Sequence, residues 1–566
     1  MPPASTELIA SPRKPFQLSS PIWRRSGLWA LPLAFLGYFF FVPLFRIFSL
    51  ALGKLSAGFG QVGTVFDVLG FTLYQAALST LLTFAIGLPA AYLFARYNFW
   101  GKSVLRALIA VPFLLPTVVV AAGFNALLGP RGMFASLFGL TNFPFMGTLS
   151  AILIAHIFYN TTIVVRIVGN ALASFDRRLE MAAIALGADP QQVVRHVWLP
   201  LLWPSILAAG LLVFLFDFTS FGVILLLGAS KFSTLEVEIY SQAVRQLNLP
   251  LAALLALIQL VCTLIVSILY SYVTRRYVRP LAPRSAQSNL RRPTTLSEKF
   301  FVGGLATALF VFFVFPLVAL PFRSVVRLEA DRGQRGQLQT GLTADYYEEL
   351  FINRRGSVFY VPPIQAALNS LLYAGATVGL SLLLGFPAAL ALARPTRLET
   401  VLDPLIMLPL GSSAVMLGLG FLLTFGRWLS SPLLVPVAHT LVALPFVIRA
   451  LQPAIAAIPE RMHQAAAVLG ASPRQVRQAI DLPLLRRAIL AAGIFAFTVS
   501  LGEFGATLLI ARPEYPTIPV AIQRFLSQPG GLNYGQAMAM ASILLVLATV
   551  SILLIEKLRL PNVGEF

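Results

Sequence analysis

Two carboxylates are notable because each lies inside a long apolar segment of the chain. Asp217 and Glu503 fall within stretches that are long enough to cross a lipid bilayer. A carboxylate in mid-membrane costs at least about 2.5 kcal/mol on insertion scales, so it usually faces a water-filled cavity or a polar partner. A hydroxyl lies within about one helical turn of each, at Ser220 and Ser500. These four residues indicate either the polar lining of a transport path or hydrogen bonding between helices, and both interpretations stay open.

Other kinds of chemistry find little support in the sequence. The Gly-Lys-Ser at 101–103 has Arg96 where a phosphate-binding loop needs its first glycine. The four histidines include His156 inside an apolar segment, and they show neither paired metal-ligand spacing nor a neighbouring carboxylate cluster. No nucleophile–base arrangement stands out either. We therefore expect no metal site, no cofactor bound to this chain and no enzymatic activity.

A polar segment that occurs twice is the strongest signal in this apolar sequence. The segments 180–200 and 463–483 align with a constant separation of 283 positions. Gly187 and Gly470 stand where a helix C-terminus favours a residue in the left-handed conformation. Each glycine is followed by an N-cap residue, a proline and, three positions after the cap, a glutamine, which together form a capping box. The spacing predicts two short helices joined at a sharp angle in each copy, with a Leu-Pro pair ending the second helix.

The repeat extends over most of the chain. Gly87–Ala91 matches Gly385–Ala389 at a separation of 298, and Ser220–Gly222 matches Glu503–Gly505 at 283. Because each half contains an even number of predicted spans, the two copies share one orientation. This predicts a parallel repeat about an axis along the membrane normal.

Composition places the chain in a membrane. Of its 566 residues 57% are hydrophobic and only 11% are charged, whereas soluble domains carry roughly 25% charged residues. The net charge of +20 is explained by arginine-rich cytoplasmic loops rather than by nucleic-acid binding. We expect an all-α integral membrane protein with about twelve transmembrane helices in two six-helix repeats. The expected spans are 28–50, 69–95, 104–128, 148–172, 205–229, 249–273, 300–322, 365–393, 401–425, 432–452, 487–511 and 533–556.

The charge pattern also predicts the topology and the division of the chain. Basic residues before the first span and after the last, Arg24, Arg25 and Lys557, place both termini in the cytoplasm. The predicted layout is a disordered tail at 1–27, a first unit at 28–277, a cytoplasmic linker at 278–299 and a second unit at 300–566. The polar loops at 176–203 and 459–486 then both face the cytoplasm.

The two polar loops resemble the EAA motif of permease subunits of binding-protein-dependent ABC importers, the type I transmembrane-domain family. That motif reads E-A-A, three residues, glycine, nine residues and I-x-L-P, and both copies keep this spacing. The motif glutamate is replaced by Met181 and Gln464, with Glu180 one residue earlier. By this resemblance the ATPase-coupling residues are Glu180, Met181, Ala182, Ala183, Gly187, Asp189, Leu199, Pro200, Gln464, Ala465, Ala466, Gly470, Ser472, Leu482 and Pro483.

Two such units fused in one chain resemble the ferric-iron and thiamine permeases. The resemblance implies a prokaryotic cytoplasmic-membrane protein that receives a small solute from an extracytoplasmic solute-binding protein. It also implies two ATPase subunits on the cytoplasmic face, which would hold the ATP and magnesium, and a path opened by alternating access. The sequence leaves iron and thiamine open as substrates. A secondary active transporter with twelve spans is the alternative, and co-purification of an ATPase would separate the two classes.

Overall fold

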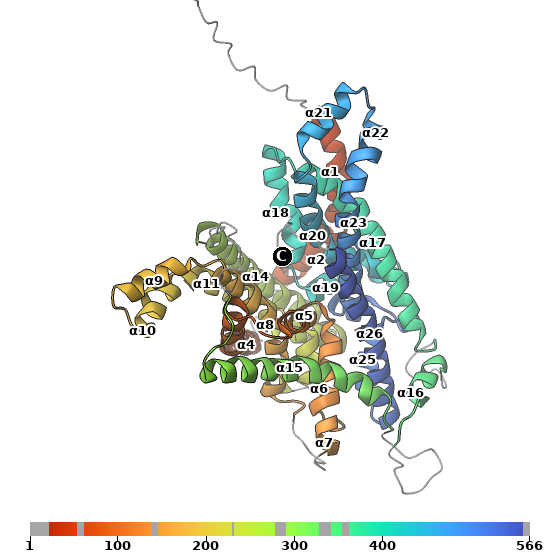
Figure 1. Ribbon diagram of the computed structural model, residues 1–566. Helices are drawn as coiled ribbons and strands as arrows, with labels where there is room; N and C mark the ends of the chain where they lie inside the picture. Colours follow the sequence, from red (N-terminus) through yellow and green to blue (C-terminus); the bar gives the residue numbers. More distant parts are fainter. Residues whose placement is uncertain are drawn as a thin grey trace, which may run out of the picture.

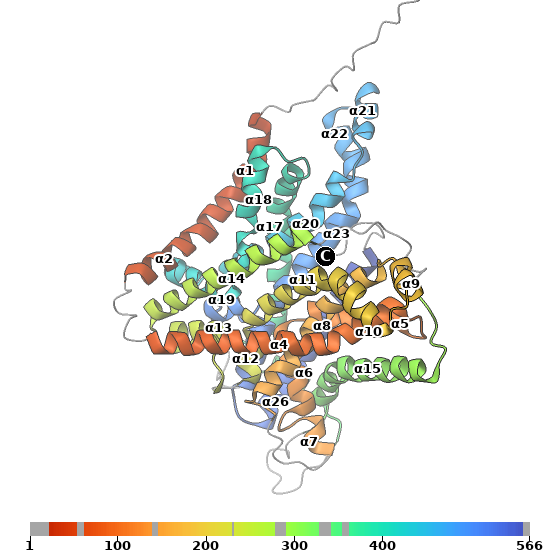
Figure 2. The same cartoon turned by 90° about the vertical axis from the view of Figure 1, so that its left-hand side faces the viewer.

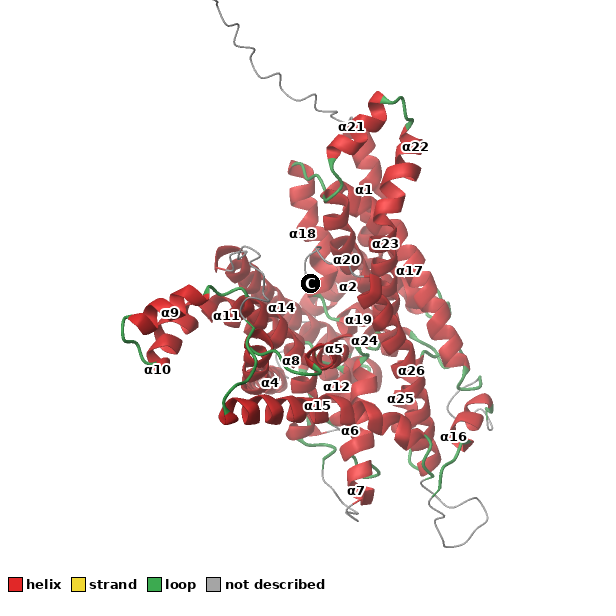
Figure 3. Ribbon diagram, viewed as in Figure 1, coloured by secondary structure: helices red, strands yellow, loops and turns green. Residues whose placement is uncertain are grey.

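The chain folds almost entirely into helices, as Figure 3 shows for the part that the structure describes. The computed structural model describes residues 22–53, 62–137, 145–228, 231–277, 290–327, 341–353 and 361–558. Most of the expected tail at 1–27 and of the expected linker at 278–299 therefore lies outside the described residues. The first helix begins at Ile22, and the first helix of the second half begins at Leu296.

The helices of the two halves follow the same order. Those of the first half are α1 (Ile22–Leu36), α2 (Val42–Gly53), α4 (Val62–Arg96), α5 (Lys102–Leu114), α6 (Thr117–Leu128), α7 (Met133–Leu137), α8 (Leu149–Ala173), α9 (Arg177–Ala185), α10 (Pro190–Val193), α11 (Leu199–Phe218), α12 (Gly222–Leu227), α13 (Leu235–Tyr240) and α14 (Leu249–Tyr277). Those of the second half are α15 (Leu296–Ser324), α16 (Asp345–Glu348), α17 (Gln365–Leu392), α18 (Arg397–Gly411), α19 (Ala414–Phe425), α20 (Leu434–Ala456), α21 (Glu460–Val468), α22 (Pro473–Val476), α23 (Leu482–Gly502), α24 (Gly505–Ile510), α25 (Ile518–Leu526) and α26 (Gly531–Leu558).

The predicted fold class is confirmed. Among the described residues, eleven helices are long and apolar enough to cross a membrane, and a twelfth span results if α18 and its neighbour α19 count as one broken span. The bend between these two helices is 94°. The chain is thus an all-α integral membrane protein with about twelve spans.

The spans predicted at 104–128 and 401–425 each consist of two helices in the structure. In the first half the chain leaves the helix at Leu115, which is extended (ψ 146°) because it precedes Pro116. In the second half Ser412 is extended (ψ 142°), and the Ser413 hydroxyl accepts the backbone N–H of Met416 to begin α19. Proline and an N-cap serine thus break the same span in both halves.

The predicted helices at 205–229 and 487–511 are also interrupted. In the first half α11 ends at Phe218 and α12 begins at Gly222, and in the second half the break falls between Gly502 and Gly505. At the second break the Glu503 carboxylate accepts the backbone N–H groups of the next helix, which caps α24. Both apolar segments therefore contain two helices.

The Leu-Pro pairs do not end the second helix of each polar pair, contrary to the sequence prediction. One helix runs from Gln191 to Phe218 and another from Pro473 to Gly502. A π-helical turn precedes each proline, at Val194–Trp198 and Arg477–Asp481. Proline has no N–H to donate to the helix. The i→i+5 hydrogen bonds of the π-helical turn change the pairing of backbone groups just before the proline, so the helix continues through it.

The first helix of each half packs against the other half. The segment α1–α2 lies beside α17 and α19, and α15 lies beside α5 and α6, as Figures 1 and 2 show from two directions. Two glycines allow the close approach. A Cβ at Gly123 would lie 2.8 Å from the Pro316 carbonyl oxygen, and a Cβ at the equivalent Gly420 would lie 2.9 Å from Cβ of Pro43. The exchanged helices thus join the two halves.

We expect Gly123→Val and Gly420→Val each to lower the free energy of unfolding of the permease by about 1–3 kcal/mol, because the added side chain has no room. Thermal unfolding of the purified protein measures the change. Gly375→Val is the matched control, because its Cβ meets nothing within 4 Å and its backbone is helical. Equal melting temperatures for the Gly123 variant and this control would contradict the packing argument.

Candidate coupling and transport sites

The turn within each polar helix pair has the local structure that the sequence predicts. The φ angles of Gly187 and Gly470 are +88° and +75°, so both glycines occupy the left-handed region. Ala188 donates its N–H to the Ala183 carbonyl oxygen and Gly187 donates to that of Ile184, which satisfies the C-terminus of α9. The same two bonds recur at the end of α21. The glycines fix the sharp angle of each pair.

The capping boxes are present in both copies. Asp189 accepts the N–H of Gln192 through its carboxylate at 2.7 Å, and the Gln192 side chain accepts the N–H of Asp189 at 3.0 Å. Ser472 and Gln475 form the same reciprocal bonds at 3.4 and 2.7 Å. Each second helix therefore begins at a fixed position relative to the first.

The helix pairs expose apolar side chains that nothing among the described residues covers. The equivalent residues Leu186 and Leu469 are 89% and 85% exposed at the tips of the pairs. Further exposed side chains lie nearby: Met181, Ile184, Leu199, Val468 and Leu482. Figure 1 shows that the two pairs, α9–α10 and α21–α22, project from the helix bundle at separate places. We call the exposed faces of these two helix pairs, together with the apolar side chains named above, the coupling surfaces. Contiguous exposed apolar side chains are typical of protein–protein contacts.

Most of the predicted coupling residues lie on these surfaces. Ala183 and Ala466 are half-buried, and the others apart from Glu180 are exposed. Glu180 instead turns inward, where its carboxylate forms a 2.8 Å ion pair with Arg96 at the end of α4. The Arg96 guanidinium also stacks 4.8 Å above the Trp198 ring. The glutamate thus fixes the first coupling helix to its own transmembrane domain.

The described part of the expected linker, residues 290–299, supports the same ion pair. Arg291 exchanges backbone hydrogen bonds with Arg96 and Asn98, and its guanidinium lies 5.1 Å from the Tyr97 ring. Burial raises the pKa of Tyr97, although Arg291 beside it acts in the opposite direction. An Arg291–Glu298 ion pair of 2.8 Å anchors this segment to α15. The end of α4 is therefore held from two sides.

The second copy uses different residues for the same connection. His463 and Asp481, which correspond to Glu180 and Trp198, form a contact of 2.7 Å. Arg394 corresponds to Arg96, but it pairs with Glu460 at 3.7 Å with more than half of each side chain exposed. The first coupling helix is therefore held by a buried arginine and the second is not.

Replacing Arg96 by alanine is expected to lower the free energy of unfolding by about 1–3 kcal/mol, because it leaves Glu180 without its partner and removes the stacking on Trp198. Arg394→Ala, the equivalent change at an exposed pair, should cost less than about 0.5 kcal/mol. Thermal unfolding of the two variants measures both. A larger loss of unfolding free energy in Arg394→Ala than in Arg96→Ala would refute this difference between the two halves.

The predicted path residues of the first half meet at a buried histidine. The two ring nitrogens of His156, on α8, lie 2.9 Å from the Ser79 hydroxyl and 2.8 Å from the Ser220 hydroxyl. The Asp217 carboxyl oxygen Oδ1 lies 3.3 Å from the ring and accepts the Asn160 amide at 2.7 Å. Asp217 is fully buried, whereas Ser220 is half-buried. Helices α4, α8 and α11 thus converge on one imidazole.

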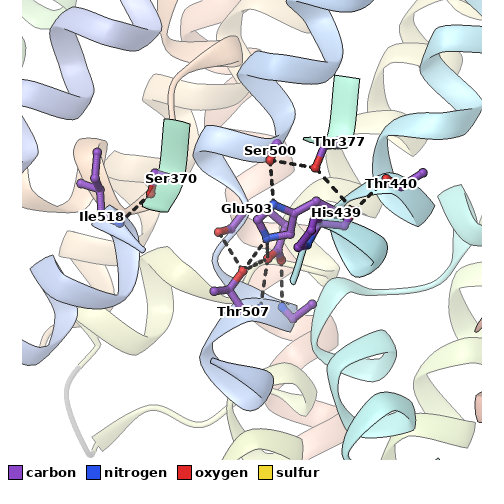
Figure 4. Close-up of polar contacts among 10 residues, drawn as sticks. Ser370, Thr377, His439, Thr440, Ser500, Glu503, Thr507 and Ile518 are labelled. Carbon is purple, nitrogen blue, oxygen red and sulfur yellow. Dashed lines mark hydrogen bonds and ion pairs between the residues drawn. The ribbon is translucent and has the colours of Figure 1, made fainter. Parts of the chain in front are cut away.

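The second half contains an equivalent cluster around His439, shown in Figure 4. The ring nitrogens lie 2.7 Å from the Ser500 hydroxyl and 2.7 Å from that of Thr507. Glu503 lies 3.3 Å from the ring, and its carboxylate accepts the backbone N–H groups of Ala506 and Thr507 at 2.8 and 3.0 Å. Both Glu503 oxygens thus have hydrogen-bond partners.

The four predicted path residues are brought together as two pairs. Asp217 and Ser220 share His156, and Ser500 and Glu503 share His439, which lies 283 positions after His156. In this conformation three of the four are buried and all bond across helices. Their role in a transport path stays a prediction. Sequence reasoning missed His439, although its separation from His156 was a readable signal.

The breaks in the fifth and eleventh spans meet between the two halves. Phe221 and Phe504, also 283 positions apart, stack with their ring centroids 5.5 Å apart and an interplanar angle of 28°. Both rings are buried. Each phenylalanine follows one helical segment of 28 to 30 residues, about 40–45 Å long, that starts at a coupling surface. A single rigid element thus connects each coupling surface with the contact between the halves.

Metal chemistry finds no candidate site in the part of the chain that the structure describes. No group of three or more His, Cys, Asp or Glu side chains there could hold a metal ion. Cys262 is a free cysteine on α14.

Comparison with known proteins identifies the class. Residues 83–279 and 381–559 each match the family described as the inner membrane component of binding-protein-dependent transport systems. These two segments cover more than half of the chain and contain both coupling surfaces. The chain therefore belongs to this family, as a fused permease with two units. This membership overturns the alternative of a secondary active transporter.

The similar proteins are permeases of similar length. The thiamine transport system permease protein ThiP of Brucella abortus is 26% identical over 97% of this chain and 98% of its own length. ThiP of Haemophilus influenzae is 28% identical over 86% of this chain and 88% of its own. ThiP of Escherichia coli is 27% identical over 89% of this chain and 91% of its own length. The chain is thus a multi-pass membrane subunit of an ABC importer.

Proposed function

We propose that the protein is the permease of an ATP-driven thiamine importer. The choice of thiamine as the substrate rests on the near full-length similarity to several thiamine transport permeases. Of the two substrates that the sequence left open, thiamine is therefore favoured over ferric iron. The Asp217 carboxylate, which has a free oxygen, suits a cationic solute in either case.

Two ATPase subunits are proposed to dock on the coupling surfaces from the cytoplasm. The exposed apolar tips, Leu186 and Leu469, supply the contact, and the capped glycine turns fix its geometry. Because Glu180 is paired with Arg96, docking of the first surface depends on shape and apolar burial more than on that charge. ATP and magnesium would be held by the ATPase subunits.

The continuous helices support a mechanism of alternating access. Movement of a docked ATPase shifts α10–α11 or α22–α23 as one body, since the π-turns keep each helix unbroken through its proline. The far ends of these helices carry Phe221 and Phe504. Rocking the halves therefore separates or closes this aromatic contact between them. A solute-binding protein on the opposite face would deliver thiamine, and both chain termini would lie in the cytoplasm.

Uptake of thiamine by cells tests the assignment of the substrate. A bacterium that needs external thiamine and lacks its own thiamine permease receives this permease with its cognate ATPase and binding protein. We expect growth at thiamine concentrations that do not support the parent strain. Growth equal to the parent strain, together with restored uptake of ferric iron in an iron-transport mutant, would favour the other substrate.

A further inference from the structure

The buried polar groups of the two halves are not equivalent, although their helices are. Five carboxyl or carboxamide side chains of the first half are at least 95% buried and have an oxygen without a hydrogen-bond partner among the described residues. They are Gln75, Asp217, Glu236, Gln242 and Gln259. A buried acceptor without a donor costs about 1–3 kcal/mol, so five in one region need an explanation.

The second half lacks all five groups. At the equivalent positions, 298 residues later for Gln75 and 283 residues later for the others, the chain has Tyr373, Ser500, Pro519, Phe525 and Ser542. Asn160, the donor to Asp217, is likewise replaced by Ala443. In contrast, the hydroxyls without a partner at Thr83 and Thr234 recur at Ser381 and Thr517. Free oxygens on carboxyl and carboxamide side chains that are at least 95% buried are therefore confined to the first half among the described residues, whereas the free carboxyl oxygen of the second half belongs to Asp403, whose side chain is 30% exposed.

Four of these residues form two neighbouring pairs. The Gln75 amide donates to the Asp217 backbone carbonyl oxygen at 2.9 Å, and the Gln259 amide donates to the Glu236 carboxylate. Thr72, one turn before Gln75 on α4, accepts the backbone N–H of Leu235 at 3.0 Å, which joins the two pairs. We call Gln75, Asp217, Glu236 and Gln259 the acceptor cluster.

The acceptor cluster lies where the two halves meet. The Ser413 hydroxyl, at the start of α19 in the second half, lies beside the Glu236 carboxyl group. Asp217 is one turn from Phe221, which stacks on Phe504 of the second half. Rocking of the halves changes both contacts. The cluster is therefore buried in this conformation and placed at the surface that the motion opens.

We propose that the first half supplies the substrate-recognition side of the transport path, and that the acceptor cluster binds a heteroaromatic cation with an amino substituent. The free oxygens accept the amino N–H groups, and the carboxylates balance the positive charge. The second half, whose Glu503 oxygens are satisfied by backbone N–H groups, stabilises the break between α23 and α24 instead. This inference rests on the proposed function, because thiamine carries both an aminopyrimidine and a positively charged thiazolium ring.

The test compares Asp217→Asn with the wild type in the complete importer, reconstituted in proteoliposomes with its ATPase and binding protein. Asparagine has the same shape and can still bond with Asn160 and Gln75, but it loses the charge. We expect thiamine transported per ATP hydrolysed to fall about tenfold, with ATPase stimulation by the loaded binding protein within about twofold of the wild type. The preference for thiamine over an analogue with a keto oxygen in place of the amino group should also fall, measured with the same binding protein.

Two further variants complete the test. Glu236→Gln, in the other pair, should reduce thiamine transport per ATP in the same way, and it decides the matter if the Asp217 variant does not fold. Glu399→Gln is the control, because this carboxylate belongs to the capping box of α18 in the second half, and it should leave thiamine transport per ATP and the preference between thiamine and the keto analogue unchanged. Wild-type thiamine transport per ATP in both Asp217→Asn and Glu236→Gln would overturn the inference and leave the proposed function intact. Absence of thiamine transport by the wild-type complex would instead refute the proposed function, and the inference with it.

Discussion

Replacing Gly187 and Gly470 together by valine is expected to uncouple ATP hydrolysis from transport. Both glycines have positive φ angles, and a side chain there costs about 1–2 kcal/mol per site in backbone strain. A Cβ at either position would meet nothing within 4 Å, so the cost arises from the backbone and not from packing. The chain relieves it by changing the angle between α9 and α10 and between α21 and α22. We expect at least a tenfold loss of uptake at about unchanged abundance in the membrane.

The control for this pair is the double variant Gly303→Val, Gly304→Val. These two glycines also have open space around a Cβ, but they lie within the helix α15 with ordinary backbone angles. Uptake and ATPase stimulation by the binding protein are measured for both double variants. Unchanged uptake and unchanged ATPase stimulation in the Gly187, Gly470 double variant would refute the assignment of these turns to coupling.

Leu186→Asp combined with Leu469→Asp is expected to abolish ATPase association. The two leucines are 89% and 85% exposed on the coupling surfaces and have the same position in the repeat. Because they contact nothing in the permease itself that would be lost, folding should be unaffected. An aspartate buried in an apolar groove of the ATPase without a partner costs several kcal/mol. A loss of about 2–3 kcal/mol at each site weakens the association of each ATPase subunit by about 30- to 160-fold.

Co-purification of the ATPase with the tagged permease measures this effect. Leu342→Asp is the matched control, because this leucine is 79% exposed but lies on the segment between α15 and α16, away from the coupling surfaces. The control should retain the ATPase in full. Retention of the ATPase by the Leu186, Leu469 double variant would place the docking contact elsewhere.

Much of the fold could be predicted from the sequence because its determinants are local. Apolar length predicts a span, and the Gly187 and Gly470 turns with their capping boxes depend on residues within a few positions of one another. The breaks within spans were missed, since apolar length does not report them. Pro116 was a readable signal for one break, whereas capping of α24 by Glu503 depends on a side-chain conformation that composition does not show.

The arrangement of the halves could not be predicted because it depends on contacts between distant residues. Nothing in the sequence around Pro43 or Pro316 indicates that its helix packs on a glycine of the other half. The candidate site was predicted in part. Asp217 and Glu503 were found by their charge, but the histidines that join them to Ser220 and Ser500 were recognisable only through the repeat.

The most direct test of the central claim is the accumulation of labelled thiamine in proteoliposomes that contain the permease, its ATPase and its binding protein. The account predicts uptake against a gradient that requires ATP and the binding protein, with no such uptake of ferric iron under the same conditions. Accumulation of thiamine without ATP, or ATP-driven accumulation of iron and not of thiamine, would contradict it.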